Sequence, residues 1–236
     1  AISAFASPGD SILLHSPTYM GFTRCITENG FNIIHSPLKQ DENGVMRMDY
    51  EDMDDKLRRY HIHVAVFCSP HNPCGRVWER EEIEKAMEVY RKNQCIVISD
   101  EIWSDLTLNG HKHTPTQSVS EDAKNRTIAF YAPSKTFNLA GLQLSNIFIP
   151  NPDLRAAFRR TLDRTGYDEP SVFGMTATQA CYEQGEEWLD ELKGVLDENY
   201  AVLEAAVARM PGVQLVPLES TYLPWLDCCG LGLDDA

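Results

Sequence analysis

Four side chains in this sequence could do chemistry together, and each stands in a short polar segment that directly follows an apolar run. They are an amine, a carboxylate, an amide and a phenol ring: Lys135, Asp100, Asn72 and Tyr19. Trp103 and Ser134 stand in two of the same segments and are further candidates. In open parallel sheets, ligands bind at the carboxyl ends of the strands. We therefore expect one crevice to hold all of these residues.

Each of the four residues also has an ordinary structural explanation. An Asn before a Pro caps turns, and an Asp at a strand end caps a following helix. A lone Lys is a surface residue by default, and a lone Tyr is a half-buried aromatic. Together, however, they supply what pyridoxal phosphate requires: an amine for its aldehyde, an anion for its ring nitrogen, a donor for its phenolic oxygen and a ring to stack on it. An anionic Asp100 would raise the pKa of that ring nitrogen by ion pairing.

Short apolar runs alternate with amphipathic segments over the first 150 residues. This pattern predicts an α/β fold, with a mostly parallel central sheet flanked by helices. The predicted strands are residues 11–15, 31–35, 63–68, 95–99, 127–131 and 143–149. The predicted helices between them are residues 18–29, 49–60 and 79–93.

The pattern changes after residue 171, where two helices over 171–184 and 186–209 precede two strands over 213–217 and 222–227. We interpret residues 1–185 as a cofactor-binding large domain without its N-terminal part. Residues 186–210 would be a linking helix, and residues 211–236 the truncated beginning of a small α+β domain. The chain has no initial Met, and residues 231–236 resemble a helix cap without a helix, so we expect a fragment.

Charge and composition exclude several classes of protein. The chain has 21 Lys and Arg against 35 Asp and Glu, a net charge of −14. This balance argues against binding of nucleic acid or of an anionic membrane surface. No apolar run is long enough to span a membrane and no leader opens the chain, which indicates a cytoplasmic protein. The seven cysteines form no Cys-x-x-Cys pair, so neither a disulfide framework nor a metal site is predicted.

Three ordered motifs carry a family resemblance. They are Ser-Pro-His-Asn-Pro-Cys-Gly-Arg-Val-Trp at 69–78, Ser-Asp-Glu-Ile-Trp-Ser-Asp at 99–105 and Ala-Pro-Ser-Lys-Thr-Phe-Asn-Leu-Ala-Gly-Leu-Gln at 132–143. They resemble the fold-type I aminotransferase superfamily, class I/II, and most closely its MalY/PatB cystathionine β-lyase branch. Residues 185–189 and 221–226 fit that branch too.

The resemblance implies a role for each candidate residue. Lys135 would be the lysine that binds pyridoxal 5′-phosphate covalently, and Asp100 the partner of the cofactor's ring nitrogen. Asn72 would bind the phenolic oxygen, and Tyr19 would stack on the ring. Trp103 and Ser134 would be further cofactor contacts. The phosphate loop and the Arg that binds the substrate carboxylate in relatives would lie outside this chain.

Two departures point toward the lyases. Gln143 stands where many aminotransferases have an Arg, and Trp103 stands where they have a Tyr. The resemblance then implies a carbon–sulfur β-lyase that converts cystathionine or a related cysteine S-conjugate to a thiol, pyruvate and ammonia. An aminotransferase acting on an amino acid is one alternative, and a non-catalytic regulatory binding protein of the same fold is another. A homodimer is implied by the resemblance alone.

Overall fold

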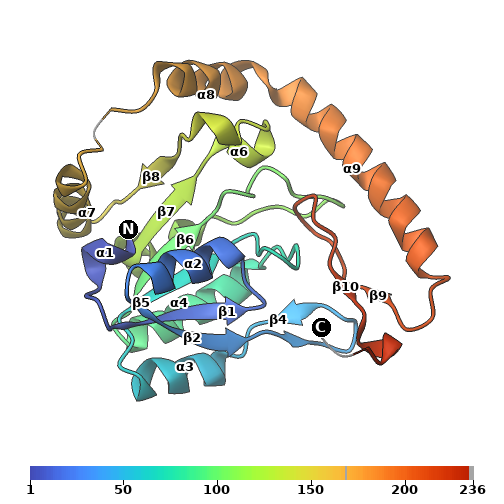
Figure 1. The fold of residues 1–236 in the computed structure, drawn as a ribbon, viewed down its shortest axis with the longest axis horizontal. Coiled ribbons are helices and arrows are strands. Elements are labelled where there is room, and N and C mark those ends of the chain that lie inside the picture. The colour runs from blue at the N-terminus through green and yellow to red at the C-terminus, as the bar shows by residue number, and fades with distance from the viewer. Residues whose placement is uncertain (168, 234–236) are drawn as a thin grey trace.

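Apolar runs of three to six residues form the central sheet of the molecule, shown in the computed structural model of Figure 1, which describes residues 1–167 and 169–233. The strand order within these residues is β2-β1-β5-β6-β7-β8. The bounds are β1 Ser11–Ser16, β2 Asn32–Pro37, β5 Val64–Cys68, β6 Ile96–Asp100, β7 Thr127–Tyr131 and β8 Asn146–Phe148. Neighbouring strands pair in parallel except β8, which is antiparallel to β7. The predicted α/β class with a mostly parallel sheet is confirmed.

Both faces of the sheet are covered, because successive side chains along a strand point to opposite faces. On one face, Leu13, Ala65, Phe67 and Val97 pack with α3 (Tyr50–Arg59) and α4 (Arg80–Lys92). On the other, Ile12, Leu14, Val64 and Ile98 pack with α1 (Ile2–Phe5) and α2 (Met20–Glu28). Burial on both faces is the reason that these strands are almost continuously apolar.

The three helices predicted between the strands are present, and their caps set their ends. Asp49 accepts a hydrogen bond from the backbone N of Asp52 at the start of α3. Glu79 and Glu82 form a capping box at the start of α4. The observed helices are two or three residues shorter than the predicted ranges, mainly because the capping residues are not themselves helical.

The remaining elements of residues 1–164 are short or peripheral. A small hairpin consists of β3 (Lys39–Gln40) and β4 (Met46–Arg47). The helices are α5 (Glu121–Arg126), α6 (Pro133–Thr136) and α7 (Pro152–Arg164), and two 3₁₀ turns cover Thr116–Ser118 and Ala140–Leu142. Of these, α6 matters most for the site because it contains Lys135.

The C-terminal part begins with α8 (Val172–Gln184) and the long α9 (Glu186–Val207), which form an arc along one side of the molecule (Figure 1). The two predicted strands at 213–217 and 222–227 were too long. Only β9 (Gln214–Leu215) and β10 (Leu226–Asp227) pair, antiparallel, and a 3₁₀ turn follows at Cys229–Leu231. The intervening residues bond to loops after β5 and β6 instead.

Two further sequence expectations concern the C-terminal helix cap and membrane-spanning segments. The helix cap expected at 231–236 falls partly on residues 234–236, which lie outside the described residues. Within residues 1–167 and 169–233, no helix has the length and apolarity needed to cross a membrane.

Candidate active site

The carboxyl ends of β1, β5, β6 and β7 meet at one edge of the sheet, and the polar segments that follow them surround a cavity of about 290 Å³. All six residues proposed from the sequence line this cavity: Tyr19, Asn72, Asp100, Trp103, Ser134 and Lys135. Gln143 and Cys68 line it as well. The structure therefore brings the candidates together, while their individual roles stay predictions.

Asp100 ends β6, directly beside the end of β5, where it pairs with Cys68. Burial raises the pKa of the Asp100 carboxyl to about 6. The backbone N–H of Ile102 donates to its Oδ1 at 3.1 Å and opposes this shift, as does the positive charge of Lys135. The side chain makes no other hydrogen bond among the described residues. It is thus a carboxylate that faces the cavity with few partners and would gain from a cation there.

Lys135 lies in the single turn of α6, which begins with Pro133 at its first position. Its Nζ is 5.6 Å from the centre of the Trp103 ring. Thr136, fully buried, donates from Oγ1 to Oδ2 of Asp105 at 3.0 Å. This hydrogen bond connects the turn that contains Lys135 to the loop after β6, the strand that ends at Asp100. It therefore fixes the position of Lys135 relative to Asp100.

Asn72 lies in the tight turn that follows β5. The turn is closed by backbone hydrogen bonds from His71 N to the Arg76 oxygen and from Gly75 N to the His71 oxygen, both 2.8 Å. The backbone N of Asn72 contacts Sγ of Cys68 at 3.5 Å, whereas its side-chain amide has no hydrogen-bond partner among the described residues. The amide does not cap its own turn, which leaves it available to a ligand.

Tyr19 is the N-cap residue of α2, and about half of its surface is exposed. Its ring packs edge-to-face on Phe22, with 5.4 Å between ring centres, and lies over Gly21. A Cβ on Gly21 would come within 2.3 Å of the Tyr19 ring. The glycine therefore leaves the space that this ring occupies.

Sequence reasoning assigned no role to two residues that support the site. Tyr222, in the C-terminal part, contacts Trp103 edge-to-face at 4.8 Å between ring centres. Its motif at 221–226 was noticed, but nothing in the local pattern indicates this contact across the molecule. The second residue is Glu101, which is fully buried next to Asp100.

Glu101 holds together the elements behind the site. It accepts hydrogen bonds from Ser99 Oγ at 2.9 Å and from the backbone N of Thr116 at 3.2 Å, and it contacts His113 Nε2 at 2.6 Å. The hydroxyl of Tyr131 donates to it too. Burial is the main cause that raises the pKa of Tyr131 above its usual range, and the negative charge of Glu101 is the second. The phenol therefore keeps its proton and donates it to the hydrogen bond. An Asp-Glu pair after a buried strand is the signal that could have indicated this network.

Comparison with known proteins agrees with this geometry. The family model described as aminotransferase class I and II matches residues 1–235. The chain is 41% identical to cystathionine beta-lyase PatB of Bacillus subtilis over 237 residues, covering 100% of this chain and 61% of the relative. It is 30% identical to Protein MalY of Escherichia coli, covering 99% of this chain and 60% of that protein.

Solved structures give the same result. Cystalysin of Treponema denticola, which contains a pyridoxal 5′-phosphate cofactor, superposes with a TM-score of 0.94 at 35% identity over 99% of this chain and 59% of that one. The PLP-bound C-S lyase of Staphylococcus hominis has a TM-score of 0.90 at 30% identity, over 99% and 60%. The chain thus spans about three fifths of the length of the relatives it matches. The chain belongs to the aminotransferase class I and II family.

Proposed function

We propose that the complete protein containing this chain binds pyridoxal 5′-phosphate and cleaves the carbon–sulfur bond of cystathionine or a related cysteine S-conjugate. The observation that carries the proposal is the convergence of Lys135, Asp100, Asn72 and Tyr19 on one cavity. The names of the relatives, cystathionine beta-lyases and C-S lyases, support the same reaction.

The residues present fit this cofactor. The amide of Asn72 has no partner among the described residues, and the carboxylate of Asp100 has only one donor there. Lys135 makes no ion pair within the same residues. An aldehyde, a protonated ring nitrogen and a phenolic oxygen would each find one of these groups. Tyr19 would stack on the ring, with Trp103 and Ser134 as further contacts.

When bound, pyridoxal phosphate supplies an electron-poor ring that accepts the charge left at the substrate's α-carbon after a proton departs. Lys135 would hold the cofactor covalently until the substrate amine replaces it. Its freed amine would then take the α-proton at Nζ as a general base. Asp100 would stay charged opposite the ring nitrogen, since an adjacent cation lowers a carboxyl pKa.

For a substrate with sulfur on its β-carbon, loss of the α-proton permits loss of the thiol. Uptake of one water then gives pyruvate and ammonia. Tyr19 would cover one face of the cofactor and exclude water from it, and Asn72 would orient its phenolic oxygen. The residues of this chain thus bind and orient the reacting groups and move one proton.

An aminotransferase would use the same residues up to removal of the α-proton. Gln143, which lines the cavity where many aminotransferases have an Arg, supports the lyase. The test is an assay of the full-length protein with cystathionine. Release of pyruvate and thiol without added keto acid is the expected result, and amino-group transfer without thiol formation would contradict it. A protein that neither binds the cofactor nor turns over would indicate the regulatory alternative.

The proposal includes the domain division, the oligomeric state and the location predicted above. Residues 1–185 would form the cofactor-binding domain, 186–210 the linking helix and 211–236 the start of the small domain. The full-length protein would be a cytoplasmic homodimer. Equilibrium sedimentation of the full-length protein tests whether it is a dimer.

A further inference from the structure

Residues 218–222 run between two loops that each carry a site residue. One loop, residues 69–76, contains Asn72, and the other, residues 101–109, contains Trp103. On one side, the backbone N of Glu219 donates to the oxygen of Gly75 at 3.0 Å. On the other side, Leu108 N donates to the Glu219 oxygen at 2.8 Å, and Thr221 N donates to the Leu106 oxygen at 2.9 Å. Residues 218–222 therefore bridge the two loops through the backbone.

Gly75 makes this close approach possible. Its φ is +63°, and a Cβ there would lie 2.4 Å from Cδ1 of Leu218 and 2.7 Å from the backbone oxygen of Ser220. Any larger residue at position 75 would push the segment away from the Asn72 turn. The turn and the segment thus fit each other only with a glycine at the contact.

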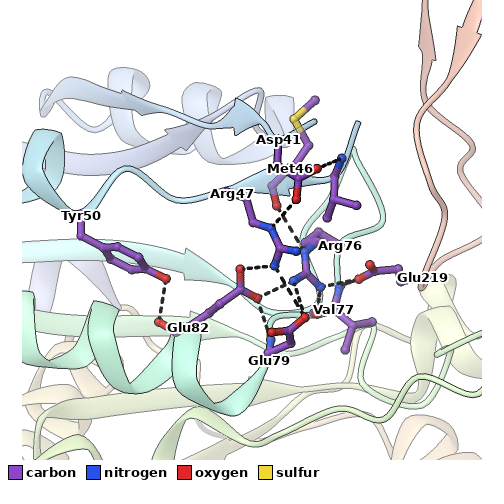
Figure 2. Close-up of polar contacts among 10 residues, drawn as sticks. Asp41, Met46, Arg47, Tyr50, Arg76, Val77, Glu79, Glu82 and Glu219 are labelled. Carbon is purple, nitrogen blue, oxygen red and sulfur yellow. Dashed lines mark hydrogen bonds and ion pairs between the residues drawn. The ribbon is translucent and has the colours of Figure 1, made fainter. Parts of the chain in front are cut away.

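A buried ion cluster fixes the same contact through side chains (Figure 2). Arg76, only 3% exposed, lies between the carboxylates of Glu82 and Glu219 and forms an ion pair with each. Glu219 Oε2 also accepts a hydrogen bond from the backbone N of Val77 at 2.8 Å. Arg76 also lies 3.5 Å from Glu79, so loss of the Glu219 charge would leave the guanidinium paired with Glu82 and Glu79 but no longer held toward residues 218–222. Glu219 therefore fixes both the guanidinium and the backbone at the end of the Asn72 turn.

The other end of the segment reaches the opposite wall of the cavity. Tyr222 packs on Trp103, and the Trp103 ring in turn lies 5.6 Å from Nζ of Lys135. Ser220, fully buried, donates from Oγ to the Leu106 oxygen at 2.9 Å and secures the loop between these contacts. One short segment thus contacts the supports of Asn72 and of Trp103, although it lies more than 100 residues from either in the sequence.

We propose that Glu219 is a positioning residue of the site. By binding Arg76 and the backbone of Val77, it holds the turn of residues 69–76 in the form that directs the Asn72 amide into the cavity. The consequence for the cofactor rests on the proposed function. The consequence for the turn does not, because the contacts are formed by the protein alone.

The first test measures hydrogen exchange in the cofactor-free, full-length protein. Glu219→Gln keeps the size of the side chain and removes its charge. We expect exchange of the backbone amides of His71 and Gly75 to rise about tenfold or more, as for a locally opened segment. The control is Asp122→Asn, which also removes a carboxylate from an arginine, Arg126, but on α5 away from the cavity. It should leave the exchange of both amides unchanged.

The second test concerns the bound cofactor. A hydrogen bond donated by the Asn72 amide disperses the negative charge of the cofactor's phenolic oxygen. The oxygen then stabilises less well the proton on the nitrogen that links Lys135 to the cofactor. Misdirecting the Asn72 amide should therefore move the pH midpoint of the cofactor's visible absorption upward, by roughly 0.5 to 1 pH unit for one lost hydrogen bond. Glu219→Gln should show this shift and Asp122→Asn should not.

The outcomes separate the two proposals. Unchanged exchange at His71 and Gly75 in Glu219→Gln, or an equal rise in every part of the molecule, would overturn the positioning role. If the parent binds no cofactor, the proposed function fails, while the exchange result still decides the role of Glu219. If Glu219→Gln does not fold, Ser220→Ala is the milder variant. It should raise exchange at Leu108 above that of the control, and parental exchange there would overturn the bridge.

Discussion

At the scale of single residues, Asp100 shows a conflict between stability and the proposed function. Burial raises the pKa of its carboxyl from 3.8 to about 6. Between these two values the folded chain binds more protons than the unfolded chain, so stability falls as the pH rises through this window. Without a further cation in the cavity besides Lys135, the ionised side chain therefore destabilises the fold near neutral pH.

Asp100→Asn should stabilise the cofactor-free protein above pH 6. The difference between 3.8 and about 6 corresponds to roughly 3 kcal/mol at most. Urea unfolding of parent and variant at pH 4 and pH 7 measures it. The parent should lose more stability between these pH values than the variant, while the variant binds pyridoxal phosphate more weakly. A variant less stable than the parent at pH 7 would show that Asp100 has a stabilising partner instead.

Gly21→Ala should weaken cofactor binding although it replaces no residue proposed to touch the cofactor. The added Cβ would meet the Tyr19 ring at 2.3 Å and displace it. Loss of one stacking contact, about 1 kcal/mol, lowers affinity roughly fivefold. Spectrophotometric titration with pyridoxal phosphate measures the effect. Gly194→Ala in α9, where a Cβ meets nothing within 4 Å, is the matched control; equal affinities in both variants would contradict a stacking role for Tyr19.

At the scale of elements, the site depends on short pieces attached to the ends of strands. The inner strands could be predicted because β1, β5, β6 and β7 are largely buried apolar runs, and the polar residues after Cys68 and Asp100 follow directly from those strand ends. The segments between residues 213 and 227 could not, because contacts with Gly75 and Leu106 determine their form. Local periodicity contains no information about such distant partners.

The same reasoning explains which site residues were found. Asn72 and Lys135 lie in motifs of consecutive residues, which can be recognised from the sequence alone. Tyr222 and Glu219 act through residues more than 100 positions away, Trp103 and Arg76, and only the folded structure shows these contacts.

Thr136→Val should reduce turnover by loosening α6. The substitution removes the Oγ1 hydrogen bond to Asp105 and leaves the side-chain volume almost unchanged. We expect a loss of about 1 kcal/mol in unfolding free energy and a fall in kcat of roughly tenfold, because Lys135 is the adjacent residue. Steady-state rates of pyruvate formation measure it. Thr165→Val, which removes a hydrogen bond at the exposed end of α7, is the control; equal kcat values in parent, Thr136→Val and control would refute the tether.

At the scale of the whole molecule, the cavity is lined by segments between residues 19 and 145, and a C-terminal segment supports one of its walls. Tyr19 comes from the N-terminal end, Lys135 from the middle, and Tyr222 supports Trp103 from the C-terminal part. The arc of α8 and α9 connects the last of these segments to the sheet (Figure 1). The geometry of the site therefore depends on the complete fold. The separate motifs can act together chemically only when the fold brings them to one cavity.

The covalent link at Lys135 is the most direct test of the account. The full-length protein, loaded with pyridoxal phosphate and reduced with borohydride, is digested and analysed by mass spectrometry. We predict a pyridoxyl adduct on Lys135 and none in Lys135→Ala. An adduct on another lysine, or no adduct on the parent protein, would contradict the proposed site and the reaction built on it.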